Sequence, residues 1–117
     1  MRYLAESDFP VRVRATLLIA GAYSTNMSEM TPEFAAPSSL TRFEEQAGHI
    51  SLYHSEDDPV VPFAELEYYR AALPHATTRA LIDRGHFNQG TFVELVADIK
   101  NQGQLFKELL VRIITHL

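Results

Sequence analysis

Residues 49–62, HISLYHSEDDPVVP, join a short apolar run to a cluster of carboxylates, and this stretch decides the fold class. Its first part, His49 to Tyr53, is continuous rather than alternating in its apolar character. Such a run is typical of a strand buried on both faces, as in a parallel sheet. Two further runs of this kind, Thr16 to Ala20 and Arg79 to Ile82, predict two more strands.

Segments with a helical pattern separate these predicted strands. Leu40 to Gln46 lies between the first two, and Pro62 to Leu73 lies between the second and the third. A third helix is expected to begin with Thr91 or a neighbour as its N-cap, since apolar residues then recur at helical spacing. Its apolar face contains Phe92, Leu95, Val96 and Ile99. Strands that alternate with helices predict the α/β class, with a three-layer α/β/α arrangement around a parallel sheet of about three strands.

The C-terminal stretch and one polar segment complete this outline. Gly103 is a candidate break in the last helix, and a second apolar stripe follows it. Surface helices normally bury one such stripe, so we expect it to cover the sheet, with an oligomer seam as the alternative. The stripe consists of Leu105, Phe106, Leu109, Leu110, Ile113, Ile114 and Leu117. Residues Ser24 to Ser39 lack any periodicity and predict a loop that lines a cleft.

The composition restricts the class of protein and its partners. The chain has 117 residues, 46% hydrophobic and 21% charged, which predicts a single globular domain over residues 1–117. The net charge of −5 and the lack of a Lys/Arg block disfavour nucleic acid and membrane surfaces as partners. The absence of cysteine excludes a disulfide and a thiolate nucleophile, and it fits a cytoplasmic location.

The apolar residues 15–22 could be mistaken for part of a signal peptide. This run is short, however, and Glu6 and Asp8 precede it where a signal would be basic, so we predict a buried strand here instead. No apolar run approaches the ~20 residues needed to cross a bilayer.

Residues able to perform chemistry follow two of the predicted strands. Asp57 and Asp58 come after the second strand, and Gly85 and His86 come after the third. Because the carboxyl ends of parallel strands meet at one edge of a sheet, we expect an acid and an imidazole to lie side by side there. A carboxylate that orients an imidazole, and an imidazole that takes a serine proton, are two members of a Ser-His-Asp triad. The order of acid before base is also the order in α/β-hydrolases.

The chain resembles the C-terminal half of an α/β-hydrolase, and most of all the small retinoblastoma-binding and YdeN-like serine hydrolases. The similarity runs from Met1 to about Ile99 and rests on LLIAGAYS (17–24), SEDDPVVPF (55–63) and DRGHFNQGTFVELV (83–96). This resemblance implies an esterase-like serine hydrolase that acts on small ester or acyl substrates without a cofactor or metal. It also implies that the catalytic residues are Asp58 as the triad acid and His86 as the base, with Asp57 as the alternative acid.

One departure from this family is as informative as the match. The sequence contains no Gly-x-Ser-x-Gly elbow, and the resemblance places the serine just before Met1, with residues 1–6 on the helix that follows it. The first hypothesis is therefore a truncated hydrolase piece that is inactive alone. The second is a non-catalytic interaction module built on the same fold. Without the nucleophile strand, the first predicted strand has an open edge, so we expect self-association through that edge or through the last helix.

Simpler interpretations of these residues stay open at this point. Asp58 before a proline is also a common turn-former. The acidic residues Glu56, Asp57 and Asp58 could bind Mg²⁺. Ser24 and Ser55 are local candidates for the nucleophile, although neither lies in a glycine-flanked elbow. The remaining histidines, which we interpret as structural or surface residues, are His49, His54, His75 and His116.

Overall fold

The protein is built on a parallel sheet of three strands with β2 at its centre. The computed structural model describes residues 1–24 and 35–115, with side chains described as far as Gln104. The strand order is β1 (Ala15–Ile19), β2 (His49–Ser55) and β3 (Thr77–Leu81), and both pairs are parallel. This arrangement confirms the predicted α/β class.

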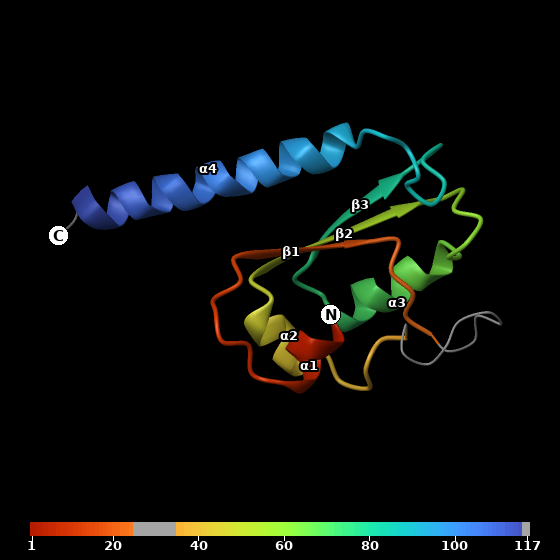
Figure 1. Ribbon diagram of the computed structural model, residues 1–117, viewed down its shortest axis with the longest axis horizontal. Helices are drawn as coiled ribbons and strands as arrows, with labels where there is room; N and C mark the ends of the chain where they lie inside the picture. Colours follow the sequence, from red (N-terminus) through yellow and green to blue (C-terminus); the bar gives the residue numbers. More distant parts are fainter. Residues whose placement is uncertain (25–34, 116–117) are drawn as a thin grey trace.

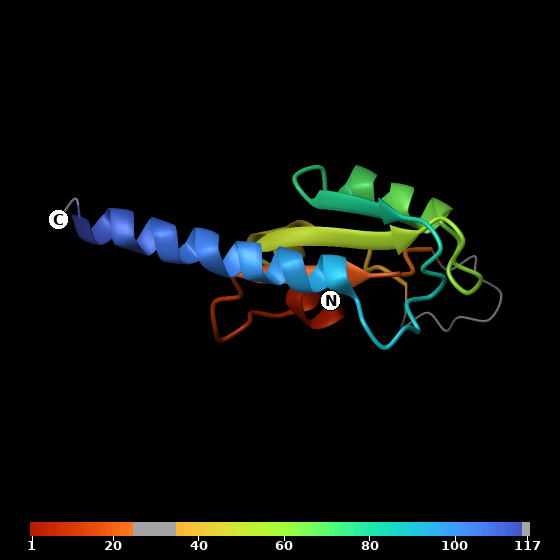
Figure 2. The ribbon, with the colours of Figure 1, turned by 90° about the horizontal axis from the view of Figure 1, so that it is seen from above.

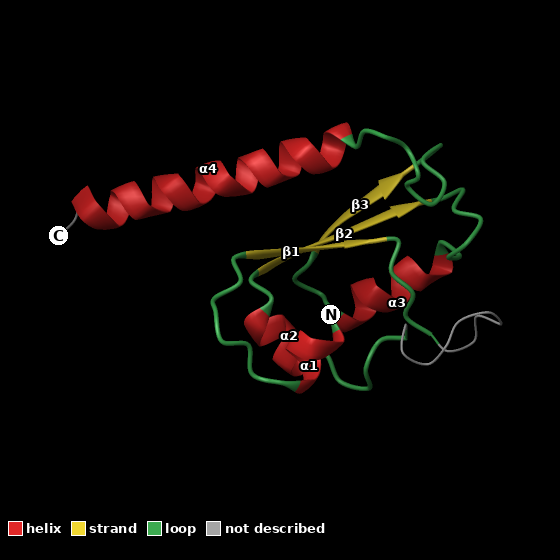
Figure 3. Cartoon of the chain, viewed as in Figure 1, coloured by secondary structure: helices red, strands yellow, loops and turns green. Residues whose placement is uncertain are grey.

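Helices lie on both sides of this sheet (Figures 1 and 3). Three short helices occupy one side: α1 (Arg2–Glu6), α2 (Thr41–Gln46) and α3 (Ala64–Ala72). The long helix α4 (Val93–Thr115) lies on the other side and runs out past the amino ends of the strands (Figure 2). Within the described residues, no helix combines the length and the apolar character that crossing a membrane requires.

Two expectations about these elements are wrong. The helix α4 continues through Gly103 without a break, because one glycine inside a helix costs only about 1 kcal/mol relative to alanine, too little to end it. Burial of the strands on both faces holds for β2, which is buried from Ile50 to Ser55, but not for the edge strands. Ile19 at the end of β1 is 38% exposed, and Ile82 directly after β3 is 64% exposed. The apolar stripe proposed beyond Gly103 has its side chains outside the described residues.

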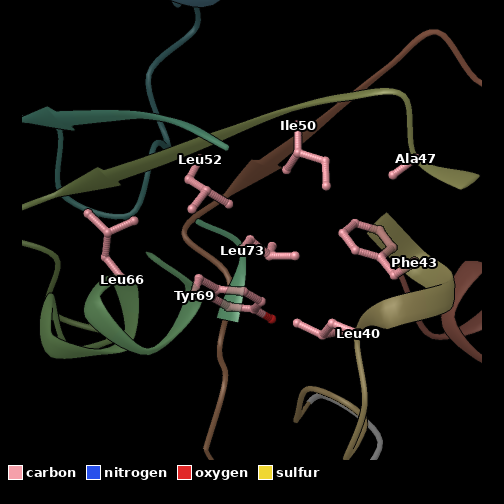
Figure 4. Close-up of a cluster of buried hydrophobic side chains, with 8 residues drawn as sticks. All are labelled: Leu40, Phe43, Ala47, Ile50, Leu52, Leu66, Tyr69 and Leu73. Carbon is pink, nitrogen blue, oxygen red and sulfur yellow. The ribbon is translucent and has the colours of Figure 1, made fainter. Parts of the chain in front are cut away.

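The hydrophobic core lies between the sheet and the layer formed by α2 and α3 (Figure 4). From the sheet, Ile50 and Leu52 project toward Phe43 of α2 and Leu66 of α3. Burying one side chain of this size contributes about 1.5–3 kcal/mol to stability. The cluster consists of Leu40, Phe43, Ala47, Ile50, Leu52, Leu66, Tyr69 and Leu73.

The opposite face of the sheet is attached to α4 mainly through polar contacts. Asp98 of α4 accepts a hydrogen bond from the Tyr53 hydroxyl at 2.8 Å. The same carboxylate receives Nε and Nη2 of Arg79 at 2.9 and 2.6 Å. Burial, together with the neighbouring Asp98, raises the pKa of Tyr53 to about 12, so this hydroxyl stays a donor. The Asp98 carboxylate of α4 therefore links β2 to β3 through hydrogen bonds with one side chain of each strand.

Gly48 makes the connection between α2 and β2 possible. Its φ of +67° lies in the left-handed region, and a Cβ atom at this position would lie 2.4 Å from the carbonyl carbon and oxygen of Arg14. That close approach lets the His49 N–H donate to the Arg14 carbonyl at 2.9 Å. The backbone of Arg14, directly before β1, thus limits which residue can occupy position 48, directly before β2.

Replacing Gly48 by alanine should destabilise the fold strongly, because the new methyl group would overlap backbone that cannot move away. We expect a loss of about 2 kcal/mol or more in the free energy of unfolding, measured by urea denaturation. Gly103→Ala is the matched control: its Cβ meets nothing within 4 Å, and a helical alanine should add about 0.5–1 kcal/mol. Equal stability of the two variants would contradict this account of the α2–β2 turn.

Candidate functional site

The loops that follow the three strands gather at one edge of the sheet (Figure 1). Residues 20–24 follow β1, residues 56–61 follow β2, and residues 82–87 follow β3. Because the strands are parallel, these loops all leave the carboxyl edge, where α/β proteins usually bind ligands. Both candidate residues, Asp58 and His86, lie in these loops.

A direct hydrogen bond joins Asp58 and His86. Nδ1 of the imidazole lies 2.9 Å from Oδ2 of the carboxylate. The Asp58 side chain is fully buried, whereas the His86 side chain is 33% exposed. The other oxygen of Asp58, Oδ1, accepts the N–H groups of Val60 at 2.8 Å and Val61 at 2.9 Å. Every oxygen of this buried carboxylate therefore has a donor.

The ionised state of Asp58 determines which nitrogen of the His86 ring donates a hydrogen bond to it. Burial by itself would raise the pKa of this carboxyl group, but the hydrogen bonds from His86, Val61 and Val60 outweigh it and hold the pKa below its ordinary value. The group is therefore ionised at neutral pH and can only accept hydrogen bonds. It follows that Nδ1 of His86 carries the proton. In neutral imidazole the opposite nitrogen, Nε2, then holds a free lone pair, and it has no hydrogen-bond partner within the part of the chain described here.

Asp57, the adjacent acid, has different partners. Its Oδ1 accepts the Ser55 hydroxyl at 2.5 Å and the Gly85 N–H at 3.1 Å. The hydrogen bond from Ser55, followed by that from Gly85, lowers the pKa of Asp57. Of the two consecutive aspartates, Asp58 is therefore the one that contacts the imidazole of His86.

His54 belongs to this cluster, although the sequence analysis assigned it no role at the site. It is 1% exposed, and its Nε2 lies 2.9 Å from the Val61 carbonyl and 3.6 Å from Oδ2 of Asp58. The ring packs edge-on against Phe63, with the centroids 5.8 Å apart. The buried carboxylate thus lies between two histidines. The four-residue spacing of His54 and Asp58 across the tight turn after β2 was the available signal.

Neither local serine faces the imidazole. The Ser24 hydroxyl donates to Oε1 of Glu65 at 2.8 Å, and the Ser24 N–H donates to the same oxygen at 3.1 Å. Glu65, 3% exposed on α3, was not identified from the sequence. The Ser55 hydroxyl donates to Asp57. Each hydroxyl proton is therefore held by a carboxylate rather than by His86.

The acidic turn does not have the arrangement of a metal site. Among the described residues, no three His, Cys, Asp or Glu side chains converge as ligands for a metal ion. Both oxygens of Asp58 accept protein donors. The magnesium alternative for Glu56, Asp57 and Asp58 therefore has no support in this part of the chain.

No protein-family model and no curated protein matches this sequence. The relationship to α/β-hydrolases thus stays a hypothesis carried by the residues themselves.

Asp58→Asn should reveal the low pKa of the buried carboxylate as a pH-dependent loss of stability. A depressed folded-state pKa stabilises the fold above the ordinary value of 3.8, and this contribution disappears as the pH falls through the folded value. We expect the variant to be about 1.5–3 kcal/mol less stable near neutral pH, a loss typical of hydrogen bonds to a charged group. The difference from the unmodified chain should shrink on acidification below 3.8.

Urea unfolding at a series of pH values measures this difference. Glu56→Gln, which removes one negative charge from an exposed side chain in the same turn, is the control and should leave stability almost unchanged. A stability gap for Asp58→Asn that stays constant from neutral to acidic pH would argue against the assignment.

Proposed function

We propose that this chain supplies the acid and the base of a serine hydrolase that cleaves small esters or related acyl compounds. Asp58 orients the imidazole, and His86 is the general base. The observation that carries the proposal is the 2.9 Å contact between Nδ1 of His86 and Oδ2 of the buried Asp58. This contact leaves Nε2 on a part-exposed ring with a lone pair available for a hydroxyl proton. The absence of cysteine supports a cytoplasmic enzyme.

The chemistry follows from this geometry. A serine oxygen attacks the carbonyl carbon of the ester while its proton passes to Nε2 of His86, and Asp58 stabilises the imidazolium that forms. The imidazolium then gives that proton to the departing alkoxide, which leaves as the alcohol. Water repeats the sequence on the acyl-enzyme and releases the acid. His86 thus transfers one proton in each half of the reaction.

The nucleophile in this proposal comes from outside the 117 residues. The sequence has no Gly-x-Ser-x-Gly elbow, and both Ser24 and Ser55 donate their hydroxyl protons to carboxylates. The elbow also supplies a backbone N–H of the oxyanion hole, whose loss alone typically costs about 10²–10³ in rate. The chain by itself is therefore expected to be inactive.

Fluorophosphonate labelling tests the proposal directly. The 117-residue chain should not be labelled, whereas a version extended upstream through an elbow serine should be labelled, and His86→Ala in the extended version should reduce the labelling rate by about 10³-fold or more. Asn88→Ala, an exposed residue two positions after the base, is the control and should be labelled normally. Absence of labelling in every extended version would exclude the hydrolase function. Labelling of the short chain at Ser24 or Ser55 would show that the nucleophile is internal.

A second candidate, an interaction module, is favoured by one specific feature. Among the described residues, β1 pairs only with β2, so its other edge has unpaired backbone groups. Ile19 on this strand is partly exposed. Unpaired edges of this kind are templates for pairing with another chain, and the simplest partner is a second copy of this one.

Sedimentation measures this self-association. We expect the chain to associate at tens of micromolar, and Ile19→Lys to shift the population toward monomer because a lysine on an edge strand opposes pairing. Val60→Lys, at an exposed position in the loop after β2, is the control and should not change the association. A stable monomer at tens of micromolar would contradict self-association of this chain.

A further inference from the structure

The loop that carries His86 has an unusual backbone. Asp83, Gly85 and Phe87 all have positive φ angles, of 57°, 55° and 55°. Glycine adopts this conformation easily, but other residues in the left-handed region cost about 1–2 kcal/mol each. A loop with two such residues persists only where its surroundings hold it in place. Contacts from outside the loop must therefore hold His86 in position for Asp58.

The end of β2 provides these contacts through Ser55 and Asp57. The Ser55 oxygen accepts the Arg84 N–H at 3.1 Å, and Oδ1 of Asp57 accepts the Gly85 N–H at 3.1 Å. The Ser55 hydroxyl in turn donates to Asp57 at 2.5 Å, so the two acceptors are joined to each other. Ser55 is completely buried. The two backbone N–H groups immediately before His86 are therefore held by one pair of side chains.

The same turn carries the triad acid. The Asp58 N–H donates to the Ser55 carbonyl at 3.2 Å, which closes a tight turn over residues 55–58. Asp57 and Asp58 are consecutive on that turn, so the group that holds the loop and the group that receives Nδ1 belong to the same hydrogen-bonded turn. Other contacts act elsewhere on the loop: Glu94 of α4 pairs with the Arg84 side chain, and Phe92, directly before α4, stacks on Phe87 with the centroids 4.9 Å apart. They do not bind the backbone at 84 and 85.

We propose that Ser55 and Asp57 are positioning residues that fix the backbone of the His86 loop so that Nδ1 meets Asp58. The inference rests on the proposed hydrolase function, because only an orienting acid and a base need this alignment. It assigns separate tasks to the aspartate pair: Asp58 orients the ring, and Asp57 places the loop from which the ring projects. The hydrogen bonds that hold the pKa of Asp57 low keep it an ionised acceptor, which favours both interactions.

Nuclear magnetic resonance on the 117-residue chain tests this role, with the imidazole tautomer of His86 and amide hydrogen exchange as readouts. In Asp57→Ala, the amides of Arg84 and Gly85 should exchange at least about tenfold faster, and the Nδ1-protonated tautomer should give way to a mixture of tautomers, as we also expect for Asp58→Asn. Asp57→Asn keeps an acceptor oxygen and should restore most of the tautomer. Glu56→Ala, in the same turn, should behave like the unmodified chain.

Each possible NMR result either supports or overturns the positioning role of Ser55 and Asp57. Faster exchange with an unchanged tautomer would make Asp57 merely structural and overturn the inference, and so would unchanged exchange. If Asp57→Ala fails to unfold cooperatively, the comparison passes to Ser55→Ala, and a normal tautomer in that variant would overturn the inference. The readout needs no nucleophile, so a failed labelling experiment would reject the hydrolase function without altering this result.

Discussion

A carboxylate removed from water must have a hydrogen-bond donor for each oxygen, and at Asp58 this requirement organises one whole edge of the molecule. Two donors are backbone N–H groups two and three residues further along the same loop, and the third is the ring of His86, 28 residues later in the chain. A buried charge that lost one of these partners would be strongly destabilising. The structure of the two loops is therefore coupled to the ionisation of one side chain.

The parallel sheet makes this coupling possible. With β2 at the centre, the turn after it lies beside the loop after β3, and residues far apart in sequence meet without a long excursion of either loop. The Glu56 N–H donates to the Leu81 carbonyl at 2.8 Å, which extends the strand pairing up to the start of the acidic turn. On the side of β2 and β3, the site is thus continuous with the hydrogen-bonded sheet. On the side of β1, the buried Glu65 holds Ser24 instead.

Strand β2 contributes side chains both to the hydrophobic core and to the site. Ile50 and Leu52 of β2 pack against α2 and α3, whereas Tyr53 faces α4 and donates to Asp98. His54 and Ser55, at the end of this strand, are both buried but polar, and each contacts one of the two aspartates. Burying polar groups without partners would be costly, and here the Val61 carbonyl pairs with His54 while Asp57 accepts the Ser55 hydroxyl. The strand that forms the core therefore also shapes the site.

Sequence alone determined the types of element and their order, because apolar runs and helical spacing are local properties of the chain. It also placed an acid and an imidazole at the same sheet edge, and it excluded an elbow serine within these residues. The predicted strand ends differ from those in the structure by one or two residues. Gly103 does not end α4, because the surrounding residues favour helix more than one glycine opposes it. Only the tertiary structure shows that Asp58, rather than Asp57, contacts the imidazole of His86. Consecutive side chains on a tight turn point in different directions, and their partners at positions 84–86 come from a distant part of the chain. For the same reason, the sequence did not identify the roles of His54 and Glu65, which depend on neighbours that only folding brings within hydrogen-bonding distance.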